Sequence, residues 1–583
     1  MNSLLIYNNN INQQIVNQFE ETSGETVPFN IGYQEIANPN FSFDKKVTEI
    51  LNQFESHEFD VIFIPFSLSE ENYIEFLGLQ FAYHIRLTQS FNNTRTPIVF
   101  FGNESPEIIN KITNAGVILF TPGVYCTTKS NVLDFKKQIA HILENKPKIT
   151  KDEYNSIFLE RIHIQPPANY STHHSIANEW SILRWAKAMS VNNDDDISTI
   201  ESKIGTSLYF KFLTARYPIK ATNIFKANDL KLNNNGKILY IDDEAEKGWS
   251  ELFSHLLYDK CKLKDFDGEL GYEFRGKKKQ EIIDLCFEKV IHYKPDLVIL
   301  DLRLHDEDFE VISPQEISGF QILKKIKQHN KGIQIIVFSA TNKIWNLLEL
   351  QKEGADGFIL KESPELSVDS EYTKQSIVNI CKTIDECLEF SFLINFYSKY
   401  EELKINLLPR TIYNTAKNPL DKNFVNEYLK WLKFGIDNIQ NYKNKEGLVT
   451  SFLILFSVLE NLANRIIDID NSESVFINKE LKYQHKFRSN NEYLKFFECS
   501  EDVFSRSNSI LYSSRSINWN QKILNTLDFL SSFEINFPNI NNIIKKRNDI
   551  IHSNTTYGNN IGISIEELKQ LFYLITNNIN NLK

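Results

Sequence analysis

The stretch that decides the fold is Lys237-Ile-Leu-Tyr-Ile-Asp-Asp-Glu244, a short apolar run that ends in two adjacent carboxylates. Its β-branched and aromatic residues predict a buried strand. Helical patterns separate it from later runs of the same kind, so the segment alternates strand with helix and predicts a doubly wound parallel sheet. The later runs, each with polar side chains at or near its end, are Asp296–Leu304, Ile335–Thr341 and Gly354–Lys361.

The polar groups of these runs fall at one edge of the predicted sheet, because ligands bind beyond the carboxyl ends of parallel strands. Three clustered carboxylates repel one another unless a hard divalent cation joins them, and oxygen ligands suit Mg²⁺. A lysine and a hydroxyl opposite the ion would neutralise and hydrogen-bond an added phosphoryl group. The groups that we expect to meet there are Asp242, Asp243, Asp301, Ser339, Thr341 and Lys361.

The order, spacing and strand context of these residues closely resemble the receiver domain of two-component response regulators, over about a fifth of the chain. The resemblance implies that Asp301 accepts the phosphoryl group and that Asp242 and Asp243 bind Mg²⁺ with it. It also implies that Ser339 is the switch hydroxyl and that Lys361 pairs with the phosphate. An upstream histidine kinase or phosphotransfer protein is the implied partner.

Three further points follow from the same resemblance. Arg303, two residues after the phosphoacceptor, would lend a backbone carbonyl to the metal, and Thr341 would be a switch residue together with Ser339. Two segments, 305–317 and 260–279, are longer than is usual in the family. The alternative is a receiver-like fold that takes no phosphate, although such relatives usually lose the acidic residues or the lysine, and all are present here.

Residues 1–150 repeat the strand order of this domain weakly, in the runs Leu4–Tyr7, Phe59–Ile64, Thr96–Phe101 and Ala115–Phe120. The superposition of the two patterns places inert residues at every reactive position: Asn8, Asn9, Pro65, Gly102 and Phe120. We therefore predict a degenerate receiver-like domain used for contact or sensing. A nucleotide-binding Rossmann-like domain is the alternative, but no glycine-rich phosphate loop follows the first strand.

Length and composition limit the rest of the prediction. A chain of 583 residues suggests three or four domains. The net charge of −11 shows no overall basic character of the kind that favours nucleic-acid binding, so any RNA contact must be local. Scattered cysteines and the absence of a secretion signal or of an apolar stretch long enough to span a bilayer lead us to expect a soluble cytoplasmic protein with no membrane contact.

Residues 151–235 form a predicted connector between residues 1–150 and the receiver domain at 236–392. Its clearest pattern, Tyr170–Met189, predicts an amphipathic helix whose buried face would contain Ile176, Trp180, Leu183 and Trp185. His173 and His174 are a candidate for phosphotransfer or ligand binding. We favour a packing or capping role, because there is too little helix here to build a phosphotransfer bundle.

Residues 393–583 change to long 3.6-residue periods and predict an all-α effector domain, so that the whole chain is α/β plus all-α. Its last long helix carries Arg547, Asn548 and His552. An imidazole serves as general acid or base near neutral pH, and a guanidinium stabilises a charged phosphoryl transition state. Together they permit metal-independent RNA cleavage, in which the ribose 2′-hydroxyl attacks the adjacent phosphate.

The run Arg-Asn-Asp-Ile-Ile-His, after a long apolar helix that carries Glu460, resembles the HEPN superfamily, which includes many toxin and antiviral ribonucleases. The resemblance implies that Arg547, Asn548 and His552 are catalytic, that Lys545 and Lys546 contact the RNA backbone, and that two copies pair to form the site.

Together these patterns predict a phosphorylation-controlled endoribonuclease, possessing Mg²⁺ at the receiver site and no cofactor for RNA cleavage, in stress or antiphage defence by analogy alone. The alternative is a non-catalytic signalling scaffold whose helical domain dimerises or binds RNA or protein. A role in nucleotide transfer is a third possibility, but the sequence has no nucleotidyltransferase signature.

Overall fold

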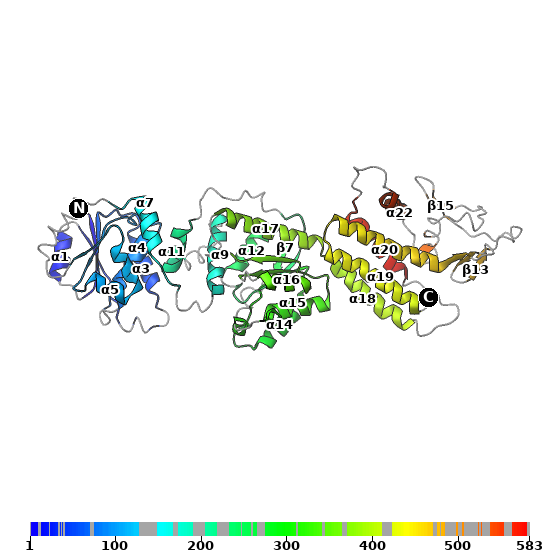
Figure 1. Cartoon of the computed structure of the whole chain (residues 1–583), viewed down its shortest axis with the longest axis horizontal. Helices are drawn as coiled ribbons and strands as arrows, with labels where there is room; N and C mark the ends of the chain where they lie inside the picture. Colours follow the sequence, from blue (N-terminus) through cyan, green and yellow to red (C-terminus); the bar gives the residue numbers. More distant parts are fainter. Residues whose placement is uncertain are drawn as a thin grey trace.

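The computed structural model places two sheet domains and one helical domain in a row, joined by connector helices (Figure 1). It describes residues 2–127, 148–166, 173–189, 205–218, 232–363, 370–410, 422–469, 537–552 and 562–579, with short gaps inside the first and fifth ranges, and a few short segments between 475 and 527.

The first domain is a five-stranded parallel sheet of order β2-β1-β3-β4-β5. The sequence predicted a parallel sheet here and three of these strands, β1, β3 and β4. Apolar residues fill both faces of the sheet, which explains why its strands read as nearly continuous hydrophobic runs. The strands are β1 (Ser3–Tyr7), β2 (Glu25–Pro28), β3 (Val61–Pro65), β4 (Ile98–Phe101) and β5 (Val124–Thr127), and the helices are α1 (Gln13–Glu21), α3 (Phe43–Gln53), α4 (Leu77–Leu87) and α5 (Pro106–Ile112).

The run from 115 to 120 is not a strand, so that prediction was wrong. It forms the 3₁₀ helix η2 (Asn114–Phe120), and β5 begins only at Val124. Gly116 packs so closely on α5 that a Cβ there would lie 2.5 Å from the Cα of Asn110. The sequence of a short apolar run does not distinguish a buried helix from a strand, and here the tight packing favours the helix. Phe120 consequently does not occupy the place of the receiver lysine.

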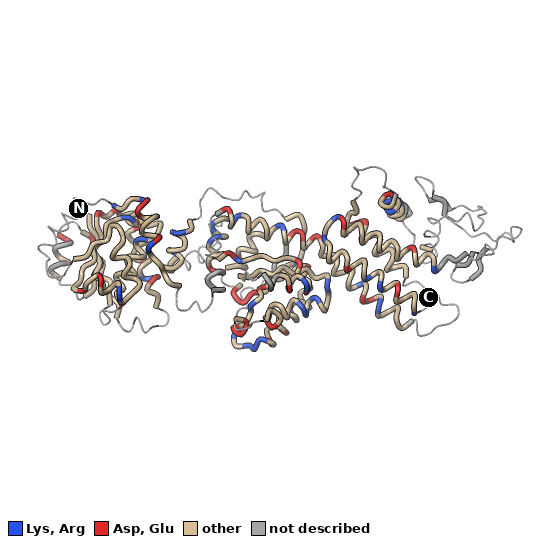
Figure 2. Tube along the Cα trace, in the orientation of Figure 1, with Lys and Arg blue, Asp and Glu red and all other residues tan. Residues whose placement is uncertain are grey.

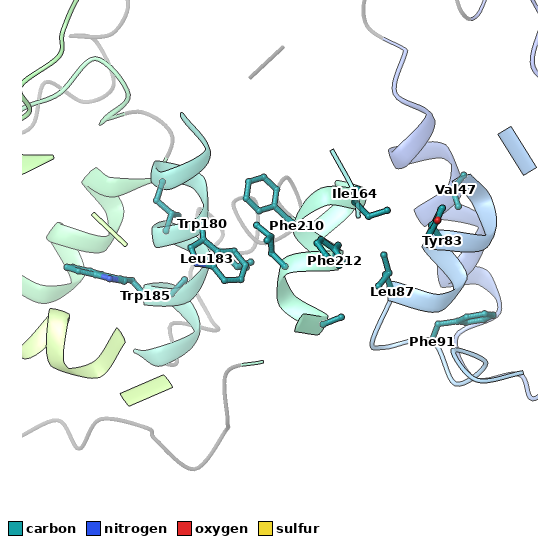
Figure 3. Close-up of a cluster of buried hydrophobic side chains, with 14 of the residues drawn as sticks. Val47, Tyr83, Leu87, Phe91, Ile164, Trp180, Leu183, Trp185, Phe210 and Phe212 are labelled. Atoms are coloured by element: carbon teal, nitrogen blue, oxygen red, sulfur yellow. The ribbon is translucent and has the colours of Figure 1, made fainter. Parts of the chain in front are cut away.

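The connector is helical and packed. Helix α9 (His173–Ala188) confirms the predicted helix, and Trp180, Leu183 and Trp185 are buried as expected. The helix is not amphipathic as predicted, because from 178 to 188 every described side chain except Lys187 is buried. The side chains of Ile176, His173 and His174 lie outside the described residues. Helix α11 (Leu208–Arg216) follows, and its Phe210 and Phe212 lie between α9 and the first domain (Figure 3).

The central domain is a second parallel sheet, of order β10-β9-β8-β6-β7. All four strands that the sequence predicted are present, and β7 adds an edge strand inside the long segment 260–279. The strands are β6 (Gly236–Ile241), β7 (Cys261–Lys264), β8 (Leu297–Leu300), β9 (Gln334–Ser339) and β10 (Gly357–Leu360), and the helices are α12 (Trp249–Leu257), α14 (Lys279–Tyr293), α15 (Ser318–His329), α16 (Ile344–Lys352) and α17 (Ser370–Glu389).

The carboxy-terminal domain is built around α20 (Lys445–Ile466), which packs on its neighbours through buried residues such as Phe452, Leu455 and Leu459. This helix is long and apolar enough to cross a membrane, contrary to our expectation that no such stretch exists, but over half of that window is buried inside the protein. The other helices are α18 (Leu393–Arg410), α19 (Lys422–Asn441), α22 (Phe537–His552) and α23 (Ile565–Ile579).

The same domain is not wholly α-helical, which corrects the sequence prediction. Short antiparallel strands follow α20 and form a three-stranded and a two-stranded sheet. Strands of three or four residues are too short to show a period against the helical background. They are β11 (Ile467–Ile469), β12 (Val475–Ile477), β13 (Glu480–Tyr483), β14 (Phe497–Cys499) and β15 (Phe504–Arg506).

A buried aspartate, Asp356, joins the receiver-type domain to the helical domain at the amino ends of β9 and β10. Its carboxylate accepts hydrogen bonds from Lys327 Nζ at 2.7 Å, Lys443 Nζ at 2.5 Å and Gln440 Nε2 at 2.7 Å. Gln440 belongs to α19, and Lys443 belongs to the turn after it. The helical domain is therefore fixed to the end of the sheet opposite the polar strand ends.

We expect the substitution Asp356→Asn to lower the free energy of unfolding by about 3–5 kcal/mol, because it leaves the buried Lys327 ammonium without a counter-charge. Chemical denaturation followed by circular dichroism measures the change. The matched control is Asp284→Asn, which removes the carboxylate of the exposed ion pair with Lys325 and should change stability little. Equal effects of the two substitutions would contradict the structural role of Asp356.

The same contribution should depend on pH in a defined direction. Burial raises the pKa of Asp356, but Lys327 and Lys443 outweigh burial and hold it below the ordinary 3.8. A carboxyl group whose pKa is depressed in the folded state stabilises the fold at pH values above its unfolded-state pKa. This stabilisation is lost as the pH falls through the folded-state pKa. The stability difference between the natural protein and Asp356→Asn should thus be full at pH 6 and shrink below about pH 4.

Candidate functional site

Three carboxylates meet at the carboxyl ends of the two central strands of the second sheet. Ile241 at the end of β6 lies opposite Leu300 at the end of β8, so the residues that follow them, Asp242 and Asp301, become neighbours. With Asp243 they form a group in which one carboxylate oxygen from each residue lies within 4.8 Å of the other two. Among the described residues this is the one group of acidic, histidine or cysteine side chains placed to hold a metal ion.

Lys361 ties this acidic group to the end of β10. Its Nζ lies 2.7 Å from Asp242 Oδ2 and 2.7 Å from Asp301 Oδ2, and all three side chains are fully buried. Asp242 is fixed further by the Tyr240 hydroxyl at 2.6 Å and by the backbone amide of Glu244 at 2.8 Å. The lysine therefore already occupies the position from which it would contact a phosphoryl group on Asp301.

The electrostatics of the group favour an added cation. Burial raises the pKa of Asp243 well above its ordinary value, and the nearby Asp242, Glu244 and Asp301 carboxylates add to the rise. Burial alone would lower the pKa of Lys361, but Asp242 and Asp301 raise it instead, so the lysine is positively charged. One lysine leaves the three carboxylates with excess negative charge, which a divalent cation would neutralise.

Two buried oxygens of the site have no hydrogen-bond partner in the described part of the chain. They are Asp243 Oδ1 and Ser339 Oγ. An acceptor of this kind suits a metal ligand, and a hydroxyl of this kind suits a donor to a phosphoryl oxygen. The donor set of Asp242, Asp243 and Asp301 thus fits Mg²⁺, and Ser339 at the end of β9 fits the predicted switch position.

The remaining receiver predictions are only partly placed. Arg303 is half-buried in the loop after β8, with its guanidinium 5.1 Å from the centre of the Phe309 ring. The metal contact of its backbone carbonyl stays a prediction. Thr341 lies outside the described residues, so its part in switching also stays a prediction.

The sequence reasoning missed the residues that order the long loop after Asp301. Asp308 is fully buried, accepts hydrogen bonds from the backbone amides of Leu304 and Ser318 at 3.1 and 3.0 Å, and pairs with Lys279 Nζ at 2.7 Å. Gly319 allows the start of α15 to pack against the backbone of Asp301, since a Cβ there would lie 2.3 Å from the Asp301 carbonyl. Nothing in the sequence distinguishes Asp308 from its exposed neighbour Asp306.

The corresponding edge of the first sheet carries the inert residues that the sequence predicted. Asn8 follows β1 and donates to the Ser67 carbonyl at 3.0 Å. Pro65 ends β3, and Gly102 follows β4. These residues supply neither a nucleophile nor the charge that holds Mg²⁺ at the second sheet.

In the helical domain, Arg547 and Asn548 lie together on α22. Arg547 Nη2 pairs with Glu460 Oε1 on α20 at 2.8 Å, and Nη1 donates to Asn548 Oδ1 at 3.2 Å. Lys545 is exposed, whereas Lys546 pairs with Glu567 at 3.3 Å. His552 is the last residue of α22, and its side chain lies outside the described residues. Its approach to Arg547 stays a prediction.

Comparison with known proteins supports the two receiver-type domains. Residues 12–127 match the Inactive Receiver domain family, and residues 280–368 match the Response regulator receiver domain family. The chemotaxis protein CheY of Thermotoga maritima is 28% identical over 127 residues, which are 21% of this chain and 84% of CheY. The oxygen regulatory protein NreC of Staphylococcus epidermidis is 28% identical over 109 residues, which are 18% of this chain and 46% of NreC.

The chain therefore contains an inactive receiver-type domain followed by a response regulator receiver domain. It spans about half the length of NreC. The predicted HEPN character of residues 393–583 stays a prediction.

Proposed function

We propose that this protein is a phosphorylation-controlled response regulator that accepts a phosphoryl group on Asp301. The observation that carries the proposal is the position of Lys361 Nζ, 2.7 Å from both Asp242 and Asp301, whose carboxylates are fully buried. The group holds three carboxylates and one lysine. The excess of carboxylate here is the arrangement expected of a site that binds a divalent cation and a phosphoryl group.

The reaction would be a simple displacement at phosphorus. A carboxylate oxygen of Asp301 attacks the phosphorus of a phosphohistidine donor, the bond from phosphorus to the imidazole nitrogen breaks, and the imidazole leaves with the electron pair. Lys361 would then bind a phosphoryl oxygen, and the Ser339 hydroxyl would donate to another. Mg²⁺, held by Asp242, Asp243 and Asp301, would neutralise charge on the transferred group.

We expect Mg²⁺ to raise the melting temperature of the natural protein, and the substitution Asp243→Asn to remove most of this shift. An ion present at about 100 times its dissociation constant adds about 2.7 kcal/mol of stability. Without Mg²⁺, Asp243→Asn should melt at a higher temperature than the natural protein, because one repelling carboxylate is gone.

Differential scanning fluorimetry across a Mg²⁺ titration measures both effects, and the control is Asp306→Asn at an exposed position of the adjacent loop. An undiminished Mg²⁺ shift in Asp243→Asn would contradict the assigned metal site.

We further propose that the carboxy-terminal domain cleaves RNA in a homodimer under the control of Asp301. The support is the half-buried Arg547–Asn548 pair, held by Glu460 beside the exposed Lys545. The ribose 2′-oxygen would attack the adjacent phosphorus and displace the 5′-oxygen, leaving a 2′,3′-cyclic phosphate and a 5′-hydroxyl. His552 would transfer the proton, and Arg547 would stabilise the charged phosphorane.

In the described parts of the chain, Figure 2 shows acidic and basic residues interspersed. The alternative proposal is a non-catalytic scaffold. The ion pair between Arg547 and Glu460 favours it, because an arginine engaged in a structural pair is not available to phosphate.

Incubation of purified full-length protein with RNA, with and without acetyl phosphate and Mg²⁺, tests the proposals together. Cleavage that changes with phosphorylation of Asp301 supports the switched ribonuclease. Intact RNA in the presence of phosphorylated protein supports the scaffold.

A further inference from the structure

Connector helix α9 contacts the segments that carry the phosphorylation site, at three points. Arg184 and Ser181 bind Glu362, which directly follows Lys361. Asn178 donates to the Glu244 carboxylate, close after the acidic pair, and accepts from Trp249 Nε1 at 3.3 Å. The helix therefore contacts the loop after β6 and the loop after β10 at once.

An aromatic cluster makes the third contact. Trp185 of α9 packs edge-on against Trp249 of α12, with 5.1 Å between ring centres. Trp249 in turn packs against Phe338 at 4.6 Å, and Phe338 directly precedes the switch hydroxyl Ser339. The rings of Trp185 and Phe338 are 6.0 Å apart. A movement of Ser339 toward a phosphoryl group would therefore disturb the packing of α9.

The contact between Arg184 and Glu362 is an ion pair in which both side chains are fully buried. Arg184 Nε lies 2.6 Å from Glu362 Oε1, and the Thr373 hydroxyl donates to the same carboxylate oxygen at 2.9 Å. The Ser181 hydroxyl holds the Glu362 backbone carbonyl at 2.5 Å. Buried ion pairs often stabilise a fold no better than apolar residues of the same size, but their directional bonds fix geometry. This pair fixes the backbone next to Lys361.

The other end of the Arg184 guanidinium faces the first domain. Nη1 donates to the Tyr217 carbonyl at the end of α11, at 2.9 Å. Helix α11 is joined to α3 and α4 of the inactive receiver domain: Lys211 Nζ lies 2.8 Å from the Thr48 hydroxyl and 3.1 Å from His84 Nδ1. Buried and partly buried polar contacts at the two ends of α11 thus link the phosphorylation site to the inactive receiver domain.

We propose that Arg184 is a positioning residue for Lys361, and that α9 and α11 transmit the phosphorylation state of Asp301 to the inactive receiver domain. The inference rests on the proposed phosphorylation of Asp301. On phosphorylation Lys361 exchanges a carboxylate contact for a phosphoryl oxygen, and any shift of its backbone acts on α9 through the Glu362 contacts with Ser181 and Arg184. Coupling between sites is reciprocal, so a partner that holds the inactive receiver domain would alter phosphorylation of Asp301.

The first test compares initial rates of phosphorylation by acetyl phosphate. Arg184→Met should lower the rate about tenfold or more, Arg184→Lys should restore part of it, and the Mg²⁺-induced melting shift should stay as in the natural protein. The matched control is Arg216→Met on α11, where the arginine is partly exposed and pairs loosely with Glu160 at 3.6 Å. A natural rate in Arg184→Met would overturn the positioning role.

The second test needs no substitution in the connector. Hydrogen–deuterium exchange is measured on the natural protein with and without acetyl phosphate plus Mg²⁺, with Asp301→Asn as the control. Exchange in residues 173–188 and 208–216 should change severalfold in the natural protein and stay constant in Asp301→Asn. Unchanged exchange in a protein that is phosphorylated on Asp301 would overturn this inference alone, whereas an unphosphorylated natural protein would overturn the proposed function with it.

Discussion

Asp301→Asn is expected to reduce stable phosphorylation by acetyl phosphate at least about 100-fold, because it removes the nucleophile of the covalent step. The amide has the shape of the carboxylate, so it can still accept the hydrogen bond from Lys361 Nζ, and the sheet should remain folded. Intact-protein mass spectrometry, which counts phosphoryl groups per chain, is the measurement.

The matched control for this experiment is Asp306→Asn, an identical chemical change at an exposed position five residues later. It should be phosphorylated like the natural protein. Undiminished phosphorylation of Asp301→Asn would assign the phosphoryl group to another residue and would remove the reason for the buried acidic group.

His552→Ala is expected to lower RNA cleavage by about 10²–10⁴-fold, the usual contribution of a positioned general acid or base. Arg547→Ala should lose about 10²–10³-fold, the cost of removing one group that stabilises developing charge. The assay uses a labelled single-stranded RNA with EDTA present, on protein phosphorylated beforehand, and circular dichroism verifies folding. An RNA with a 2′-deoxy nucleotide at the cleaved position should resist the natural protein.

The control variant is His163→Ala, at an exposed histidine in the connector. Equal cleavage by the natural protein and His552→Ala would exclude His552 from the chemistry. Loss of activity in His552→Ala with Arg547→Ala fully active would exclude the arginine and favour its structural pairing with Glu460.

Local sequence explains why the receiver site could be predicted. Strands β6, β8, β9 and β10 are apolar runs that end at polar residues, and parallel strands bring those ends to one edge. Asp242, Asp301 and Lys361 met there as expected. The same reasoning gave a wrong prediction for the run at 115–120, because Gly116 lets this run pack as a helix against α5. The local sequence does not show that α5 lies beside it.

What the sequence by itself determined is the two parallel-sheet domains, the four main strands of the second sheet with their reactive side chains, and the loss of those side chains from the first sheet. The tertiary structure alone decided that α9 binds the loop next to Lys361 and that Asp356 anchors the helical domain. Ser181 and Glu362 stand 181 positions apart, and Lys443 and Asp356 stand 87 apart. Residues so far apart in the sequence produce no periodic pattern, because each is a single position. Only the folded chain brings the two partners together.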